Sequence, residues 1–270
     1  MQLSVTAWSF PACSLAECAA ISCALGINAL DVGLFYRSAL DKALILSDPR
    51  AAAKDVRQLG IAIPNYYHLF GDGLAGRNLS LPGTIAQNVA DVEQVLTFAD
   101  AAGIASVFIL PGIINPGQSR DDAARQSARS LHELLQVAGH HRAKLCIEPH
   151  VHGWAESPAL VRRLIDDTGI GLALDYSHFA CLGYRQDEID PLAPHAVHAH
   201  LRQAKMGHLQ AKFAQGTLNF PAMFATLRDA GYRGWLAIEA VHQDYMNTLN
   251  DDVLTETIKL RDCFRAWKGD

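Results

Sequence analysis

The chain has 270 residues, half of them hydrophobic, 19% charged and 8% aromatic, which excludes a disordered protein and suits a globular enzyme. Its 23 basic residues face 28 acidic ones, giving a net charge of −5 with histidine neutral, so nucleic acid and acidic membrane surfaces are poor candidate partners. The sequence has no basic leader, no run of about 18 apolar residues and no C-x-x-C pair among six scattered cysteines, so we expect a cytoplasmic protein with reduced thiols.

Eight apolar runs along the chain have the length and composition of β-strands. They are Leu3–Trp8, Ala29–Phe35, Ala62–Tyr67, Ser106–Leu110, Lys144–Glu148, Gly171–Asp175, Val197–Leu201 and Trp235–Glu239. The stretches between them show helical periodicity, with apolar residues at spacings of three and four. These are Leu15–Leu25, Arg50–Leu59, Ile85–Ala102, Asp122–Ala138, Pro158–Asp167, a short helix at Gln186–Leu192, Pro221–Ala230 and Asp251–Trp267. Polar residues typical of helix N-caps precede several of them: Ser14, Asp48, Asp121 and Ser157.

This alternation predicts the fold. Strands that alternate with helices pair in parallel through right-handed crossovers. A closed (β/α)₈ barrel normally needs roughly 250 residues, and no linker or change in composition divides this chain. We therefore expect one α/β domain over residues 1–270, a single TIM barrel, with an open doubly wound sheet as the alternative. Neither G-x-G-x-x-G after the first strand nor G-x-x-x-x-G-K-[ST] occurs, so the usual nucleotide-binding signatures are absent.

Four consecutive predicted strands, the fifth to the eighth, carry acidic or imidazole side chains at matching depth. They bring Glu148, Asp175, His200 and Glu239 to the carboxyl end of the barrel, where active sites of this fold lie. Three carboxylates beside one imidazole would repel one another unless a cation compensated them. A set of three oxygen ligands and one nitrogen favours Mn²⁺, with Mg²⁺ and Co²⁺ as alternatives, whereas Zn²⁺ usually takes more nitrogen or sulfur.

The second half of the chain also contains motifs of a known family. Leu174–His178 (LDYSH) resembles its D-x-x-H at the sixth strand, and His198–Arg202 (HAHLR) resembles its H-x-H-L-[KR] at the seventh. Gly216–Phe220 (GTLNF) and Ala230–Glu239 (AGYRGWLAIE) resemble the ending that follows. In combination these motifs resemble the xylose-isomerase-like TIM barrel superfamily, in its sugar phosphate isomerase/epimerase branch.

The resemblance implies a divalent metal bound by Glu148, Asp175, His200 and Glu239, most readily Mn²⁺, with Mg²⁺, Co²⁺ or Zn²⁺ as alternatives. It implies that Glu148 and Glu239 are an acid/base pair that exchanges the proton α to the substrate carbonyl through a metal-stabilised enediolate. It also implies that His178 contacts a substrate hydroxyl.

Three positions depart from the family pattern. Gln203 follows the seventh-strand motif where aspartate is frequent, Trp154 stands where the ketose 3-epimerases have an acidic residue, and Asp31 replaces a more common glutamate. His198 points the same way as His200 but one layer deeper, which predicts a hydrogen-bonded interior histidine.

Further candidates for substrate binding come from the loops and strand ends. His150 lies two residues beyond Glu148 and shares its inward face if the strand persists. Lys205 and Arg202 are cations that could hold a substrate carboxylate or phosphate. His68 could close the opposite side of the pocket, and Trp154 could supply part of its apolar wall.

These residues predict a metal-dependent isomerase or epimerase of a small sugar or polyhydroxy carbonyl compound. The alternative is a lyase (a dehydratase, an aldolase-type enzyme or a decarboxylase) that acts on a sugar-derived keto acid through the same site. A DNA-repair endonuclease is disfavoured by the acidic charge balance, and a non-catalytic sugar-binding protein is the remaining class. A homo-oligomer is left open, since dimers and tetramers are common among such enzymes.

Overall fold

Eight parallel strands form the centre of the molecule. The computed structural model describes residues 1–249 and 252–269. The strands pair in the order β2-β1-β8-β7-β6-β5-β4-β3. Their bounds are β1 Gln2–Thr6, β2 Leu30–Asp31, β3 Asn65–Tyr67, β4 Ser106–Ile109, β5 Lys144–Ile147, β6 Gly171–Asp175, β7 Ala196–Leu201 and β8 Trp235–Ile238.

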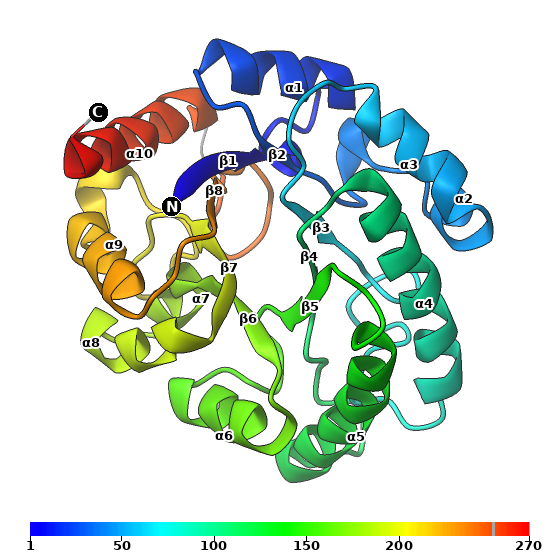
Figure 1. Ribbon diagram of the computed structural model, residues 1–270. Coiled ribbons are helices and arrows are strands. Elements are labelled where there is room, and N and C mark those ends of the chain that lie inside the picture. The colour runs from blue at the N-terminus through cyan, green and yellow to red at the C-terminus, as the bar shows by residue number, and fades with distance from the viewer. Residues whose placement is uncertain (250–251, 270) are drawn as a thin grey trace.

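The sheet closes on itself between its two end strands, β2 and β3. Parallel bridges join Ala29 to Ala62 and Val32 to Tyr66, just outside the regular strands. Val32 N donates to Asn65 O at 3.1 Å and Tyr67 N donates to Val32 O at 2.9 Å. The strands therefore form a ring (Figure 1), and the predicted TIM barrel is confirmed while the open doubly wound sheet is wrong.

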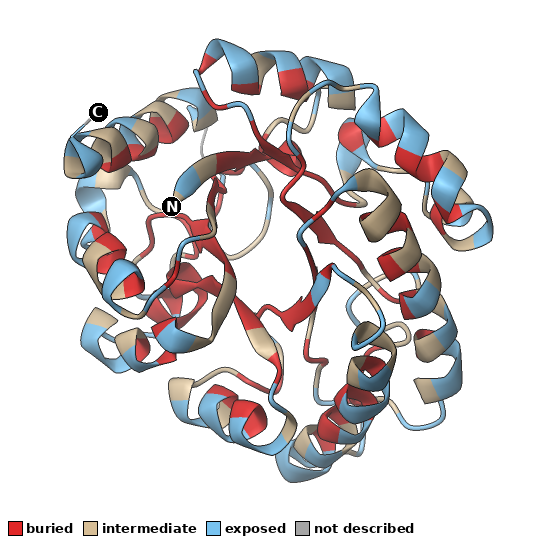
Figure 2. Cartoon of the chain, in the orientation of Figure 1, coloured by how far each residue is buried: buried red, intermediate tan, exposed pale blue. Residues whose placement is uncertain are grey.

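The helices surround this ring, and the longer ones have one buried face (Figures 1 and 2). In α4, for example, Val92, Leu96 and Ala99 are fully buried on one face. The helices are α1 Leu15–Ala24, α2 Lys42–Ser47, α3 Pro49–Arg57, α4 Ile85–Ala102, α5 Arg120–Ala138, α6 Pro158–Thr168, α7 Tyr176–Cys181, α8 Gln186–Ile189, α9 Phe220–Asp229 and α10 Val253–Lys268. In the described ranges none of them is long and apolar enough to cross a lipid bilayer.

Side-chain caps set most of the helix starts that the sequence predicts. Ser14 forms a capping box with Glu17, and Asp48 and Ser157 accept the expected backbone N–H groups at the starts of α3 and α6. The cap of α5 is Ser119 rather than Asp121, so this helix begins earlier than predicted.

Other differences between the predicted and the observed helices concern short elements. Both α2 and α7 were missed, because six residues hold too few turns for a periodic pattern. The helix predicted at Gln186–Leu192 is α8 followed by a 3₁₀ segment, Asp190–His195. The predicted first residue of the last helix, Asp251, lies outside the described residues.

Polar side chains fill part of the barrel interior. Ser4, Asp31, Asn65, His198 and His200 come from four different strands, and each is at most 1% exposed. A small apolar cluster lies nearer the carboxyl ends of the strands and includes Trp8, Tyr67, Phe108, Cys146, Ala173 and Val241. The carboxyl end of the barrel is therefore built from buried polar groups next to aromatic rings.

Candidate metal centre

Four acidic or imidazole side chains meet at the carboxyl end of the barrel. Glu148 directly follows β5, Asp175 ends β6, His200 lies in β7 and Glu239 directly follows β8. One potential ligand atom from each of these residues lies within 4.8 Å of the others. All four are buried, Glu239 being the most exposed at 8%. The structure thus brings the four predicted ligands together from four neighbouring strands.

One ring nitrogen of His200 faces both glutamates. This atom, Nδ1, is 2.6 Å from Glu148 Oε1 and 3.6 Å from Glu239 Oε2. Trp8 Nε1 donates a 2.7 Å hydrogen bond to Glu239 Oε1, which fixes that carboxylate from β1. The other oxygen, Oε2, is buried and accepts no hydrogen bond in the described structure. Only the longer contacts with His200 and with Arg202, at 3.4 Å, offset the cost of burying this oxygen.

Asp175 joins the site to the helix that follows it. Its Oδ1 accepts the backbone N–H of Ser177 at 2.8 Å and so caps α7. Its Oδ2 accepts from Arg202 Nη2 at 2.7 Å, and the same nitrogen is 3.4 Å from Glu239 Oε2. Arg202 also donates from Nε to Ser177 Oγ at 3.0 Å. A fully buried guanidinium therefore lies against two of the three carboxylates.

The protonation of the site follows from its burial. Burial raises the pKa of Glu148 to about 7, against the opposing attraction of His200. Burial lowers the pKa of His200, but the carboxylates of Glu148 and Glu239 outweigh it and raise this pKa to about 10. At neutral pH His200 therefore holds a proton on Nδ1 that a metal ion would replace. The site therefore offers three carboxylates and one imidazole as ligands, and the single guanidinium balances only part of the negative charge. This ligand set fits a divalent cation.

Two neutral histidines line the same site. His178 Nδ1 accepts the backbone N–H of Val151 at 3.2 Å, and the His150 ring lies 4.3 Å from the His178 ring, measured between centroids. Burial lowers the pKa of His150 to about 4 and that of His178 well below its usual range. Both rings are therefore uncharged at neutral pH, as groups that hydrogen-bond to hydroxyls should be.

These groups open into a cavity of about 380 Å³, a size typical of small-molecule sites. Its polar lining includes Glu148, Glu239, His150, His178 and Arg202. Its wall is largely aromatic and apolar and consists of Trp8, Phe35, Tyr36, Tyr67, Leu74, Phe108, Leu209 and Tyr245, with Gln243 and Asp244 at the eighth strand's loop. The sequence prediction missed Tyr67 and Phe108, whose rings stack at 4.3 Å.

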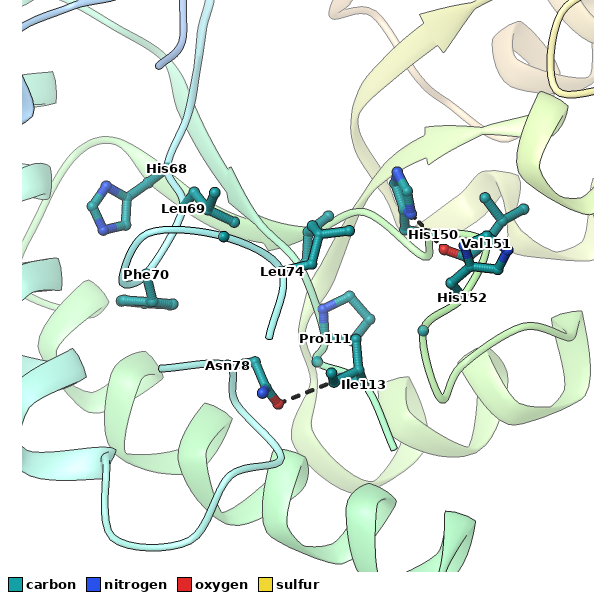
Figure 3. A pocket seen from close by; sticks show the side chains of 14 residues that line it. His68, Leu69, Phe70, Leu74, Asn78, Pro111, Ile113, His150, Val151 and His152 are labelled. Atoms are coloured by element: carbon teal, nitrogen blue, oxygen red, sulfur yellow. Dashed lines mark hydrogen bonds between the residues drawn. The ribbon is translucent and has the colours of Figure 1, made fainter. Parts of the chain in front are cut away.

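His68 lies on the other face of its strand from this cavity. Side chains alternate along a strand, so Tyr67 faces the barrel interior while Tyr66 and His68 face the helices. The Tyr66 ring packs 5.4 Å from Phe98 of α4, and His68 Nδ1 is 3.4 Å from Tyr66 Oη. His68 instead borders a second cavity, which shares His150 with the first, and the two histidines lie on opposite sides of it (Figure 3).

Trp154 and Lys205 are also not brought to the metal centre. Trp154 is buried in the helix-side core, and its Nε1 donates to Pro111 O at 2.9 Å. Lys205 lies in a turn where its backbone pairs with that of His208, and its side chain does not border the described cavity. Of the six predicted substrate contacts, the structure places His150, His178 and Arg202 at the site.

Comparisons with known proteins bear on the family and the fold. Residues 22–263 match the sequence profile of a family described as xylose isomerase-like TIM barrel. The 2-oxo-tetronate isomerase of Pectobacterium atrosepticum is 24% identical over 175 residues, which cover 59% of this chain and 63% of that enzyme, less than two thirds of its length. A D-tagatose 3-epimerase-like protein has a TM-score of 0.75 at 16% identity, covering 100% of this chain and 99% of its own. The IolI protein with a zinc atom has a TM-score of 0.74 at 14% identity, covering 99% of each chain. At these identities the two solved structures establish the fold alone.

Metal affinity should depend on pH. Because the proton on His200 Nδ1 must leave when a cation binds, affinity for Mn²⁺ or Zn²⁺ should rise about tenfold per pH unit near pH 8, and more steeply below pH 7, where Glu148 also carries a proton. Calorimetric titration in two buffers of different ionisation enthalpy should show the release of about one proton per ion at pH 8 and more than one at pH 6. Affinity that does not change with pH would contradict the protonation described for His200.

Trp154 should matter for stability and not for metal binding. Trp154→Phe removes part of a buried ring and its hydrogen bond to Pro111 O, which keeps only the bond from Ser127 Oγ, so the free energy of unfolding should fall by roughly 1–3 kcal/mol. Urea denaturation measures this loss, and metal affinity should stay within twofold of the parent protein. Unchanged stability with weakened metal binding would instead place Trp154 at the centre.

Proposed function

The chain belongs to the xylose isomerase-like TIM barrel family, and from this membership we propose that it is a divalent-metal-dependent isomerase or epimerase of a small sugar or related polyhydroxy carbonyl compound. The observation that carries the proposal is the placement of two buried glutamates, Glu148 and Glu239, beside Nδ1 of His200 in the lining of a sugar-sized cavity. The name of the curated relative, an isomerase of a 2-oxo-tetronate, supports the reaction class and a small oxygen-rich substrate.

Glu148, Asp175, His200 and Glu239 would hold the metal ion. When bound, a divalent ion supplies Lewis acidity that polarises the carbonyl and hydroxyl oxygens of the substrate. Mn²⁺ is the first choice for three oxygen ligands and one nitrogen, with Mg²⁺ and Co²⁺ next. Zn²⁺ should be tested beside them, because the similar IolI protein was solved with a zinc atom.

The two glutamates suit a proton exchange at the carbon next to the carbonyl. The pKa of Glu148 lies near 7, so this carboxyl can both give and take a proton at neutral pH. Trp8 holds one oxygen of Glu239, while the other accepts no hydrogen bond and has only longer contacts with His200 and Arg202. We propose that one glutamate removes the proton and the other returns it.

Neutral groups around the glutamates would orient the substrate hydroxyls. His178 Nδ1 accepts from the Val151 backbone, and its Nε2 lies 3.3 Å from Arg202 Nη2 and 3.6 Å from Asp175 Oδ2, so the ring is held beside the metal ligands. We propose that it contacts a substrate hydroxyl there. His150 borders the same cavity, and the aromatic wall shields the reacting carbon from water. Arg202 is the one cation in the described lining, and Asp175 and Glu239 already hold it. We therefore propose an unphosphorylated substrate.

Exchange with solvent deuterium tests the reaction. In D₂O, deuterium should enter the substrate at the carbon next to the carbonyl without release of water, CO₂ or a carbon fragment, as followed by NMR. Glu148→Gln and Glu239→Gln should each lower kcat by about 10²–10⁴-fold, since each removes one proton carrier. Glu133→Gln, on the exposed surface, is the control and should leave kcat unchanged. Release of water, CO₂ or a fragment would mean that the enzyme is a lyase.

A substrate panel tests the unphosphorylated class. Four- to six-carbon ketoses and keto acids are each compared with the corresponding phosphate ester. We expect kcat/KM to be at least about tenfold higher for the free compound, because the described cavity lining has no unpaired cation to bind the phosphate. A preference for the phosphate esters would overturn this part of the proposal.

A further inference from the structure

A second polar group lies one layer deeper in the barrel than the metal centre. It consists of Asp31 at the end of β2, together with His198 and His200 of β7. A carboxylate oxygen of Asp31 and one ring nitrogen of each histidine lie within 4.8 Å of one another. Asp31 is 0% exposed, and each histidine is 1% exposed. None of the comparisons or the reaction proposed above gives Asp31 or His198 a role.

The contacts within this group are close but incomplete. His198 Nε2 is 2.6 Å from Asp31 Oδ2, the distance of an ion pair, but the groups are not aligned for a regular hydrogen bond. Both oxygens of Asp31 and the Nε2 atoms of both histidines are buried without another hydrogen-bond partner in the described structure. Each such atom costs about 1–3 kcal/mol when it is left unsatisfied. The cheapest arrangement is one in which these atoms satisfy one another.

The two ring nitrogens of His200 lie in different surroundings. Nδ1 is the nitrogen that lies beside Glu148 and Glu239, so it is the nitrogen that a metal ion would take. The ring proton must then reside on Nε2, which is buried and unpartnered. A histidine ligand usually donates this second N–H to a carboxylate or carbonyl, and that contact fixes both the tautomer and the ring orientation. Asp31 is the carboxylate of the deeper group.

We propose that Asp31 and His198 are positioning residues for the metal ligand His200. Asp31 faces His198 Nε2 with one oxygen and provides the acceptor for the Nε2–H of His200, while His198 holds the carboxylate in place. Nδ1 of His200 is thereby left for the cation. Metal affinity then depends on a pair of side chains that never touches the ion. This inference rests on the proposed function, because it concerns the same metal centre.

A second metal ion between these three side chains is the competing explanation. Ligand atoms bound to one ion at about 2.0–2.2 Å normally lie about 3 Å or more apart from each other. The 2.6 Å separation of Asp31 and His198 is shorter than that, but His200 and Glu148 of the metal centre are equally close, so this distance alone does not decide. The deeper group has one carboxylate where the metal centre has three, and neither Asp31 nor His198 lines the cavity. The ligand set and its position therefore favour the pair over an ion, and binding stoichiometry separates them.

Metal titration of Asp31→Asn is the primary test. The variant keeps the shape of the side chain and removes its charge, so the affinity for Zn²⁺ or Mn²⁺, measured by competition with a chelator, should fall about 10–100-fold at an unchanged stoichiometry of one. Ser4→Ala is the matched control: Ser4 is also fully buried in the barrel with an unpartnered hydroxyl, but it carries no charge. Its metal affinity should stay within twofold of the parent protein.

A spectroscopic readout separates positioning from a merely structural role. In the zinc-loaded parent protein, imidazole ¹⁵N–¹H correlations should show His200 protonated on Nε2, and this signal should shift or broaden in Asp31→Asn. The visible spectrum of the Co²⁺-loaded protein should change in the same variant. His198→Gln, which leaves Asp31 in place, should lower the affinity by a smaller factor and keeps the test available if Asp31→Asn does not fold.

Three results would overturn the inference or its premise, and they are distinguishable. Parent-like affinity and spectra in folded Asp31→Asn would refute the positioning role. Two ions bound per parent chain would make Asp31 and His198 ligands in their own right. A parent protein that binds no divalent ion would refute the proposed function itself.

Discussion

The interaction on which the rest of the site depends is the mutual repulsion of three buried carboxylates. Glu148, Asp175 and Glu239 lie within ligand distance of one another, and inside a barrel water cannot screen them. Arg202 and a protonated His200 balance part of this negative charge. Oε2 of Glu239, which accepts no hydrogen bond, carries part of the charge that is not balanced. A divalent cation would neutralise the remaining negative charge. The proposed metal site, the shifted pKa values and the proposed proton exchange therefore all follow from the repulsion of these carboxylates.

Contacts from outside the cluster hold the carboxylates of Asp175 and Glu239 and the backbone of Glu148. Asp175 caps α7, and Trp8, in the turn just after β1, donates a hydrogen bond to Glu239. Glu148 is tied to β4 through its backbone N–H, which donates to Ile109 O at 3.0 Å. Because these contacts come from the scaffold, the cluster keeps its shape without depending on the cavity's contents, and the deeper pair Asp31–His198 extends the same support to His200.

The eight-stranded fold and the meeting of Glu148, Asp175, His200 and Glu239 could be predicted from sequence, because strand ends recur at regular spacing and all point to one rim. What could not be predicted depends on a single residue of register or on contacts across the barrel. Whether Tyr67 or His68 borders the cavity depends on which face of β3 points inward, and that changes with a shift of one residue. The contact of Asp31 with His198 joins two strands that are far apart in the chain. Trp154 and Lys205 belong to loops whose path no periodic pattern specifies.

The central claim is that four side chains at the carboxyl end of the barrel form one divalent metal site. Anomalous X-ray scattering from crystals soaked in Mn²⁺ tests it most directly. The account predicts a single strong peak in bonding contact with Glu148, Asp175, His200 and Glu239. No peak at these residues, or a peak between Asp31 and His198 instead, would contradict it.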